Sequence, residues 1–425
     1  MRETSNLEAG RDIGFRLASS LSRGRVAAWF EAGLDIAALL FFPLLVLVPR
    51  GIAALLSVAG VCAAGLLLSA GRQRLNATLG VAAALLVCLV LWGAISASWS
   101  INPTRSLTMA ARLTGLFAAG VALAGAAQVL AAPRRLMFTL IVGLVLALGV
   151  SAIDLATAGS ISTLFSDRVY RTSWLNQASI SFAILLFPAS AALFLLGLTR
   201  AAAVIAAATA ASVFALAGTA AKAVLIAGLA MGFVLHQSRS RATRVAAVVS
   251  VIAIVTAPLT FGRLDRVPGL GEKADTVKTS AGHRLLIWSF TSDRIAERAL
   301  TGWGLDASRA IPGGSDLIRP TETWLPLHPH NAALQVWLEL GVPGAVLFAL
   351  LIALAWTALA NARLPPLFAA AAGAALTAGL VGCFATYGIW QEWWLGTLWF
   401  SLFIVLVMAR AVSAASGVER EPAET

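Results

Sequence analysis

A dozen apolar runs, most of them close to 20 residues long, constrain this chain of 425 residues more than any other feature. A helix needs about 20 mostly apolar residues to cross a bilayer, because lipid offers no partner to an unpaired backbone group. The composition agrees, with 59% hydrophobic and only 12% charged residues, whereas soluble domains carry about 25% charged residues. We therefore expect an all-α polytopic integral membrane protein, and a soluble enzyme or a disordered chain is excluded.

Twelve candidate spans follow from these runs. They are expected at residues 33–49, 51–70, 78–97, 107–132, 136–157, 178–198, 201–217, 219–236, 244–261, 342–360, 366–386 and 391–410. The chain shows no internal repeat of the kind that marks many transporter folds.

The basic residues of the short loops indicate the orientation. Nine lie in five loops on one side: Arg72, Arg74, Arg134, Arg135, Arg200, Arg239, Arg241, Arg244 and Arg363. Four lie in short loops on the other side: Arg50, Arg105, Arg168 and Arg171. The positive-inside rule then places both termini in the cytoplasm. This topology explains most of the net charge of +11, and since no nucleic-acid-binding module is visible, no nucleic-acid partner is expected.

One long loop interrupts the pattern of short connections. Residues 262 to about 330 lie on the outer side, with helical periodicity from Gly282 to Leu300 and too many aromatic residues for disorder. Long loops of this kind are usually functional or disordered. The expected division is a cytoplasmic segment 1–32 that an amphipathic helix would fit, spans one to nine in 33–261, an ordered outer domain 262–341, spans ten to twelve in 342–410, and a cytoplasmic tail 411–425.

Ionisable residues within the spans gather near their outer ends. They are Arg112, Asp154, Lys222 and Glu392. Such residues are costly in lipid and are functional candidates for that reason, although each could instead snorkel to the interface or form a pair there. Their shared side predicts an active region that faces outward.

Three of the four histidines belong to the outer loop: His283, His328 and His330. Asn331 is a candidate helix cap after His330, and Gly341 to Gly344 is expected to break that helix before span ten. A histidine accepts a proton near neutral pH, which suits a general base. The alternative is an exposed or capping histidine without a chemical role.

The outer side is also rich in cations, among them Arg168, Arg171, Lys222 and Arg284. Guanidinium groups bind phosphate oxygens in a bidentate fork, so this group of residues suits a lipid-linked pyrophosphate. Several arginines of the loop are instead expected to pair with its acids, namely Arg294, Arg298 and Arg309. The sequence shows neither a metal-ligand cluster nor a nucleotide-binding glycine loop, so no metal and no cofactor are expected.

Three short motifs, through their order along the chain and their placement in it, resemble those of the bacterial O-antigen ligases and the related O-antigen polymerases. His330-Asn331 followed by Gly341 and Val-Pro-Gly is similar to the C-terminal motif of that family. Gly282 to Trp288, continued by Gly302-Trp-Gly304, is similar to its Arg-x-x-x-Trp segment and the following turn. Lys222 stands where the family usually has a Ser-Arg pair. A lysine there keeps the positive charge and loses the bidentate guanidinium fork.

The resemblance implies a glycosyltransferase of GT-C-like architecture, without a metal, in the inner membrane of a Gram-negative bacterium, with its active site and the 262–341 domain in the periplasm. The donor would be O-antigen on undecaprenyl pyrophosphate, and the acceptor a terminal sugar of lipid A-core. His330 would be the general base, and Arg284 and Lys222 would hold the pyrophosphate. Arg168 and Arg171 join this group by loop position alone, while Asn331, Glu339 and His328 would support it. Besides these substrates and membrane lipids no partner is expected; a monomer is favoured, although the sequence leaves the oligomeric state open.

Three alternatives remain at this point. An O-antigen polymerase would use a second lipid-linked glycan as acceptor, and a protein O-oligosaccharyltransferase of the same superfamily would use Ser or Thr. A secondary transporter belongs to a different class, and the absence of charges at the expected midplane argues against it.

Overall fold

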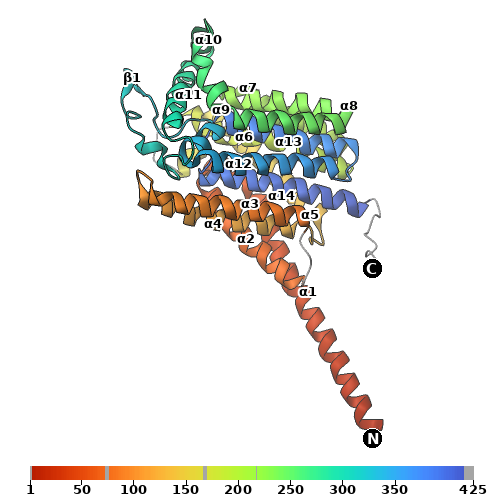
Figure 1. The fold of residues 1–425 in the computed structure, drawn as a ribbon. Helices are drawn as coiled ribbons and strands as arrows, with labels where there is room; N and C mark the ends of the chain where they lie inside the picture. Colours follow the sequence, from red (N-terminus) through yellow and green to blue (C-terminus); the bar gives the residue numbers. More distant parts are fainter. Residues whose placement is uncertain (1, 72–75, 166–169, 217, 416–425) are drawn as a thin grey trace.

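The computed structural model describes residues 2–71, 76–165, 170–216 and 218–415, and within 2–23 only the backbone. It confirms the all-α membrane fold: ten helices of the described chain are long and apolar enough to cross a membrane. Figure 1 shows them packed side by side as one bundle. The long helices are α1 (Arg2–Leu47), α2 (Gly51–Ser69), α3 (Ala77–Ile95), α4 (Pro103–Ala126), α5 (Pro133–Thr157), α6 (Asn176–Leu195), α7 (Thr199–Ala215), α8 (Thr219–Val255), α12 (Ala332–Asn361), α13 (Pro366–Ala385) and α14 (Glu392–Ala415).

The expected count of twelve differs from ten because of α7 and α8. The α7 helix is apolar but shorter than the others, with 17 residues. The α8 helix has 37 residues and holds two of the expected spans, one on each side of a kink at Ser238. Directly after the kink, Arg239 donates hydrogen bonds to the carbonyl oxygens of Leu359 in the last turn of α12 (2.6 Å) and Leu364 in the α12–α13 connection (3.1 Å). A straight helix of this length would be about 55 Å long, far more than a bilayer core of about 30 Å, so the kink lets two spans follow each other.

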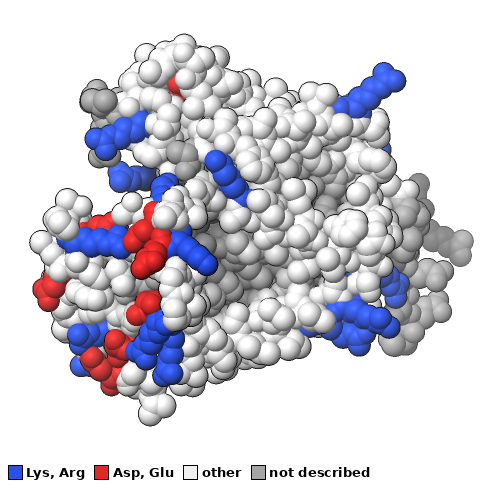
Figure 2. Space-filling model, turned by 90° about the horizontal axis from the view of Figure 1, so that it is seen from above, with Lys and Arg blue, Asp and Glu red and all other residues white. Residues whose placement is uncertain are grey.

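Shorter elements gather at one end of the bundle, which is on the left in Figure 1. They are α9 (Ala257–Thr260), η4 (Phe261–Arg266), α10 (Leu270–Val277), α11 (Thr279–Glu297), η5 (Ala307–Ala310) and a two-stranded antiparallel ribbon of β1 (Leu317–Arg319) and β2 (Glu322–Thr323). We call this end, which carries residues 257–331, the loop end. On the face in Figure 2 both signs of charge gather there, Lys and Arg alone gather at the other end, and an uncharged band lies between.

Gly341 breaks α12 as the sequence predicts. Its backbone is left-handed, with φ +62° and ψ −155°, and residues 299–304 of the loop end pack against the break. The Val342 N–H donates to the Ala299 carbonyl at 3.0 Å, and the Gly304 N–H donates to the Glu339 carbonyl at 2.9 Å. The break therefore joins the loop end to the bundle.

Replacing Gly341 by alanine is expected to lower the free energy of unfolding by about 2 kcal/mol, because a side chain at positive φ is strained. The new Cβ would also lie 2.6 Å from the Leu300 carbonyl oxygen. Thermal unfolding in detergent measures the effect. Gly149→Ala in α5 is the matched control, since nothing lies within 4 Å of its added Cβ. An equal midpoint for the two variants would show that the break tolerates a side chain.

Candidate active site

His330 lies at the loop end, directly before the cap of α12. The cap is Asn331, as predicted, and its side-chain oxygen accepts from the Leu334 N–H at 3.1 Å. The indole N–H of Trp288 on α11 donates to the Pro329 carbonyl at 2.9 Å and fixes the segment before it. His330 itself has φ +56°, an uncommon backbone conformation that clusters at functional sites. The fold therefore holds this histidine in one defined place.

Hydrogen bonding selects one tautomer of the His330 ring. Its Nδ1 contacts the backbone carbonyl of Thr386, the residue after α13. A carbonyl oxygen only accepts, so Nδ1 carries the proton and Nε2 of the neutral ring is left with a free lone pair. No group of the described residues donates to Nε2. The ring is thus oriented like a base whose accepting nitrogen is available to a substrate.

His328 lies beside His330, with ring centroids 4.3 Å apart. Its Nδ1 faces the backbone N–H of His330 at 3.2 Å, and its Nε2 faces the backbone N–H of Gly388 at 3.2 Å. Burial, together with the neighbouring His330 ring, lowers the pKa of His328 to about 3. His328 is therefore neutral, and it lies between the backbone of His330 and the loop after α13.

Burial also lowers the pKa of His330, to about 4. The Thr386 carbonyl opposes this shift, whereas the cation of Arg284 adds to it. At neutral pH the ring is therefore uncharged, the protonation state that a general base requires.

Arg284 on α11 is the nearby cation. Within the described chain it makes no ion pair and no hydrogen bond, yet it is partly buried, and this burial lowers its pKa. It lies near Tyr387, whose pKa is raised by burial and drawn down by Arg284. A partly buried guanidinium without a carboxylate is costly unless an anion reaches it. The arrangement suits an anionic ligand beside His330.

Glu339 differs from the two histidines in its burial and in its hydrogen bonds. It is completely buried, and it accepts hydrogen bonds from the Asp306 N–H (2.5 Å), Gln335 (3.1 Å) and Trp390 (2.6 Å), and also from the Ser308 hydroxyl. Gln335 in turn accepts from the Ile389 N–H at 3.0 Å. Glu339 therefore joins the loop end, α12 and the segment before α14, and its carboxylate is fully occupied.

The other predicted cations are not drawn into this cluster by any contact. Lys222 lies in the first turn of α8 and Arg171 is exposed before η3 (Thr172–Leu175), and the side chain of neither has a partner among the described residues. Arg168 lies outside the described residues. Three of the four ionisable residues of the expected spans are structural: buried Asp154 accepts from the Ile161 N–H at 2.8 Å, and Glu392 pairs with Arg112 at 2.9 Å.

Sequence reasoning missed three residues of the site. Thr386 contributes a backbone carbonyl, which no sequence pattern announces. Tyr387 lies near Arg284, and its place in an aromatic stretch of the sequence that ends at Trp394 does not indicate this. Gln335 links the two halves of the site, and its spacing of five from His330 and four from Glu339 was the available signal. In the part of the chain that the structure describes, no group of three or more His, Cys, Asp or Glu side chains is arranged to hold a metal ion.

The comparisons with known proteins match one part of the chain. Residues 187–349 match the family model described as O-antigen ligase. The matched range includes six of the eight predicted site residues: Lys222, Arg284, His328, His330, Asn331 and Glu339. Arg168 and Arg171 lie outside it.

Similar curated proteins carry a name of the same type. A "Putative polysaccharide ligase" of Rickettsia conorii is 33% identical over 165 residues, which are 37% of this chain and 40% of that protein. That of Rickettsia felis is 34% identical over 144 residues, which are 33% of this chain and 35% of that protein. That of Rickettsia prowazekii is 31% identical over 169 residues, which are 37% of this chain and 40% of that protein. The matches thus span well under half of these relatives. The chain is a multi-pass membrane protein whose residues 187–349 match the O-antigen ligase family model.

Proposed function

We propose that this protein transfers O-antigen glycan from undecaprenyl pyrophosphate to a terminal sugar of lipid A-core, at the periplasmic face of the inner membrane. One observation carries the proposal: the free Nε2 of the neutral His330 ring lies near the partner-free guanidinium of Arg284. The transfer has to deprotonate a hydroxyl and release pyrophosphate. The first step needs a base, and the second needs an unpaired cation beside it.

The reaction proceeds in one balanced step. Nε2 of His330 takes the proton of the acceptor hydroxyl while that oxygen attacks the anomeric carbon of the donor glycan. The bond from this carbon to the pyrophosphate oxygen breaks, and the leaving group keeps the electron pair. Arg284 stabilises the charge that develops on it, with Lys222 as a second cation at the start of α8. The negative donor also favours the imidazolium, so it raises the pKa of His330 toward neutral pH when it binds. No metal is required for this chemistry.

The lipid tail of the donor needs a path beside the bundle. An apolar groove of about 320 Å³ lies at the end of α8, lined by Val249, Ile252, Ala253, Thr256, Thr260, Phe261 and Leu264. Phe261 connects it to the site, since its ring contacts Trp288 at 5.6 Å and Phe384 at 6.2 Å between centroids. The groove therefore borders α11 and α13, the two elements next to His330.

Filling the groove with Ala253→Trp is expected to raise the KM for the lipid-linked donor about tenfold, which corresponds to about 1.4 kcal/mol of lost binding. The KM for the acceptor should stay unchanged. Initial rates at varied donor concentration measure the effect. Val248→Trp is the matched control, because Val248 is 57% exposed on the same helix and outside the groove. If both variants behave alike, the tail does not use this groove.

Transfer by the purified full chain tests the proposed function. The reaction contains undecaprenyl-pyrophosphate glycan, lipid A-core, detergent and a chelator. A slower-migrating lipopolysaccharide band supports the ligase. A longer lipid-linked glycan with unmodified lipid A would instead indicate a polymerase, and loss of activity in the chelator would contradict the metal-free mechanism. Absence of any product from folded protein would overturn glycan transfer to lipid.

A further inference from the structure

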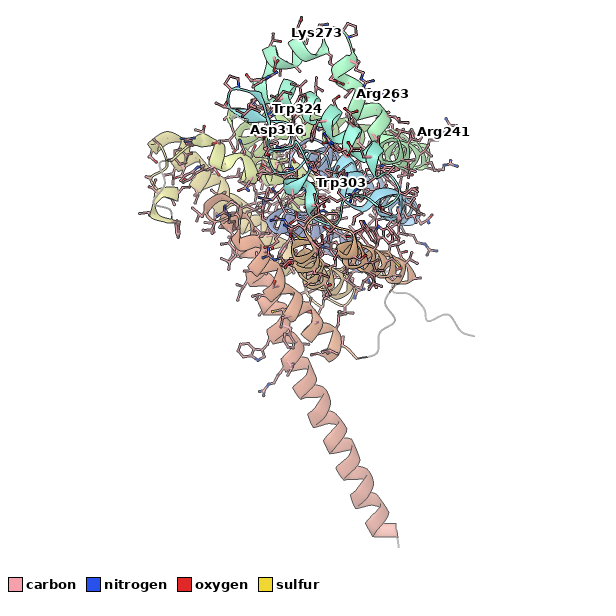
Figure 3. All side chains as sticks on the ribbon, turned by 60° about the vertical axis from the view of Figure 1, so that its left-hand side comes forward. Arg241, Arg263, Lys273, Trp303, Asp316 and Trp324 are labelled. Carbon is pink, nitrogen blue, oxygen red and sulfur yellow. The ribbon has the colours of Figure 1, made fainter. Side chains whose placement is uncertain are left out.

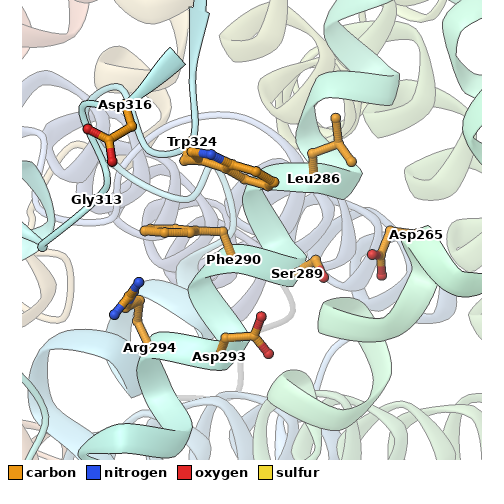
Figure 4. A pocket seen from close by; sticks show the side chains of 9 residues that line it. All are labelled: Asp265, Leu286, Ser289, Phe290, Asp293, Arg294, Gly313, Asp316 and Trp324. Atoms are coloured by element: carbon orange, nitrogen blue, oxygen red, sulfur yellow. The ribbon is translucent and has the colours of Figure 1, made fainter. Parts of the chain in front are cut away.

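A second cavity lies at the loop end, apart from His330. It has a volume of about 370 Å³ and is lined mainly by α11, η4 and the segment around β1 and β2. Its principal side chains are Asp265, Phe290, Asp293, Arg294, Asp316 and Trp324, shown from close by in Figure 4. Pockets of about 300–1,000 Å³ that combine aromatic walls with a few polar groups are typical small-ligand sites.

Two aromatic rings form the wall of the cavity. Phe290 and Trp324 stack with their centroids 5.7 Å apart and their planes 25° apart. The backbone N–H of Trp324 donates to the Asp316 carbonyl at 3.1 Å, so the two residues lie next to each other, as Figure 3 also shows. The negative face of an aromatic ring attracts the partly positive C–H groups of an apolar surface.

The polar groups of the cavity are mostly free acids. None of the carboxylates of Asp265, Asp293 and Asp316 has a hydrogen bond or ion pair in the described chain, and Oδ1 of Asp265 is shielded from solvent as well. The one cation, Arg294, is already neutralised by Glu297 at 2.7 Å and lies over Phe290. The cavity is therefore rich in acceptors, and it repels anions.

The cavity and the His330 site lie on opposite faces of α11. At about 100° per residue, Arg284, Trp288 and Thr291 share one face, and Trp288 binds the Pro329 carbonyl there. Leu286, Phe290 and Asp293 point the other way and line the cavity. Since a helix is about 10–12 Å wide, the two sites are one helix apart.

We propose that this cavity is a sugar subsite that takes an uncharged or ammonium-bearing hexose ring. The C–H face of the ring lies on the indole of Trp324, which Phe290 supports from behind, and its hydroxyl or ammonium groups donate to Asp265, Asp293 and Asp316. The inference rests on the proposed function, since both a donor glycan and a lipid A-core carry such rings. At one helix width from Arg284, the subsite holds a sugar away from the bond that reacts. The division of charge keeps the pyrophosphate at Arg284 and the sugar in the acidic cavity.

Binding of three disaccharides to the full chain in detergent tests whether the cavity prefers ammonium-bearing and neutral sugars to acidic ones. The probes are N,N′-diacetylchitobiose, which is neutral, deacetylated chitobiose, which carries ammonium groups, and cellobiouronic acid, which carries a carboxylate. Saturation-transfer NMR and calorimetry are expected to show the ammonium form bound about tenfold more tightly than the acid, with the neutral form between them. Trp324→Ala should weaken the neutral and ammonium forms about fivefold or more, within the range of aromatic contacts. The double variant Asp293→Asn with Asp316→Asn should remove the preference for the ammonium form.

Glu272→Gln on α10 is the matched control, because Glu272 is an exposed acid of the same segment that does not line the cavity. Equal affinity for all three probes, no measurable binding, or unchanged binding in Trp324→Ala would overturn the subsite. The source of the sugar follows from transfer kinetics: Trp324→Ala raises the KM for the donor if the ring belongs to the donor glycan, and the KM for the acceptor if it belongs to the core. Failure of the proposed function would look different, since wild type would then bind the probes without transferring glycan.

Discussion

Replacing His330 by asparagine is expected to lower kcat for glycan transfer by about 10²- to 10⁴-fold, the range typical of a lost general base. Asparagine tolerates the positive φ of this position, and its amide can still donate to the Thr386 carbonyl that holds the native ring. What it lacks is the basic nitrogen that His330 presents as Nε2. The variant therefore removes the chemistry and keeps the fold, and its unfolding midpoint should stay near that of wild type.

The pH dependence separates a base from a positioning group. Burial lowers the pKa of His330 to about 4 in the free protein. Protonation inactivates a base, so kcat/KM should fall as the pH falls through about 4 and stay flat from about 5 to 7. The residual activity of His330→Asn should show no such acid limb.

His236→Ala is the matched control for this experiment. His236 is exposed and lies near the Ser238 kink, far from the loop end, so its removal should leave the rate and the pH profile unchanged. Wild-type activity in His330→Asn would rule out His330 as the base.

The fold could be predicted largely from the apolar runs, because a membrane span has one dominant physical requirement. The positions of eleven helices, the cap at Asn331 and the break at Gly341 all follow from local sequence. The kinked α8 was harder to foresee, since its two spans are joined by a continuous helical segment in which Ser238 alone leaves the helical conformation.

The candidate site was only partly visible in the sequence. His330 and Arg284 could be named, because their chemistry and their order along the chain are informative. Their environment depends on residues far away, such as the backbone of Thr386, which is 56 positions from His330. The environment of Glu339 likewise depends on residues far away in the sequence. Its role follows from donors at Asp306, Ser308 and Trp390, which only the tertiary structure brings together.

The unpaired charge of Arg284 links stability to function. Structural ion pairs elsewhere at the loop end are complete: Arg105 binds Asp306 at 2.7 Å, and Arg319 binds Asp275 at 2.9 Å. Arg284, in the neighbourhood of His330, is a cation with no ion pair among the described residues. A protein keeps such a costly group where a ligand supplies the missing anion.

Replacing Arg284 by methionine is therefore expected to have opposite effects on transfer and on stability. Transfer should fall by about 10²- to 10³-fold in kcat, the usual cost of losing one group that stabilises a developing charge. The unfolding midpoint of the ligand-free protein should stay equal or rise, because methionine fills the same partly buried space without a charge. Added pyrophosphate should raise the midpoint of wild type and leave that of the variant unchanged, as linkage requires for a ligand that binds only the native state. Arg266→Met is the matched control, since Arg266 is an exposed cation of η4, and it should keep both transfer and the response to pyrophosphate. A variant at Arg284 that transfers glycan at the wild-type rate, or that still responds to pyrophosphate, would show that the leaving group is held elsewhere.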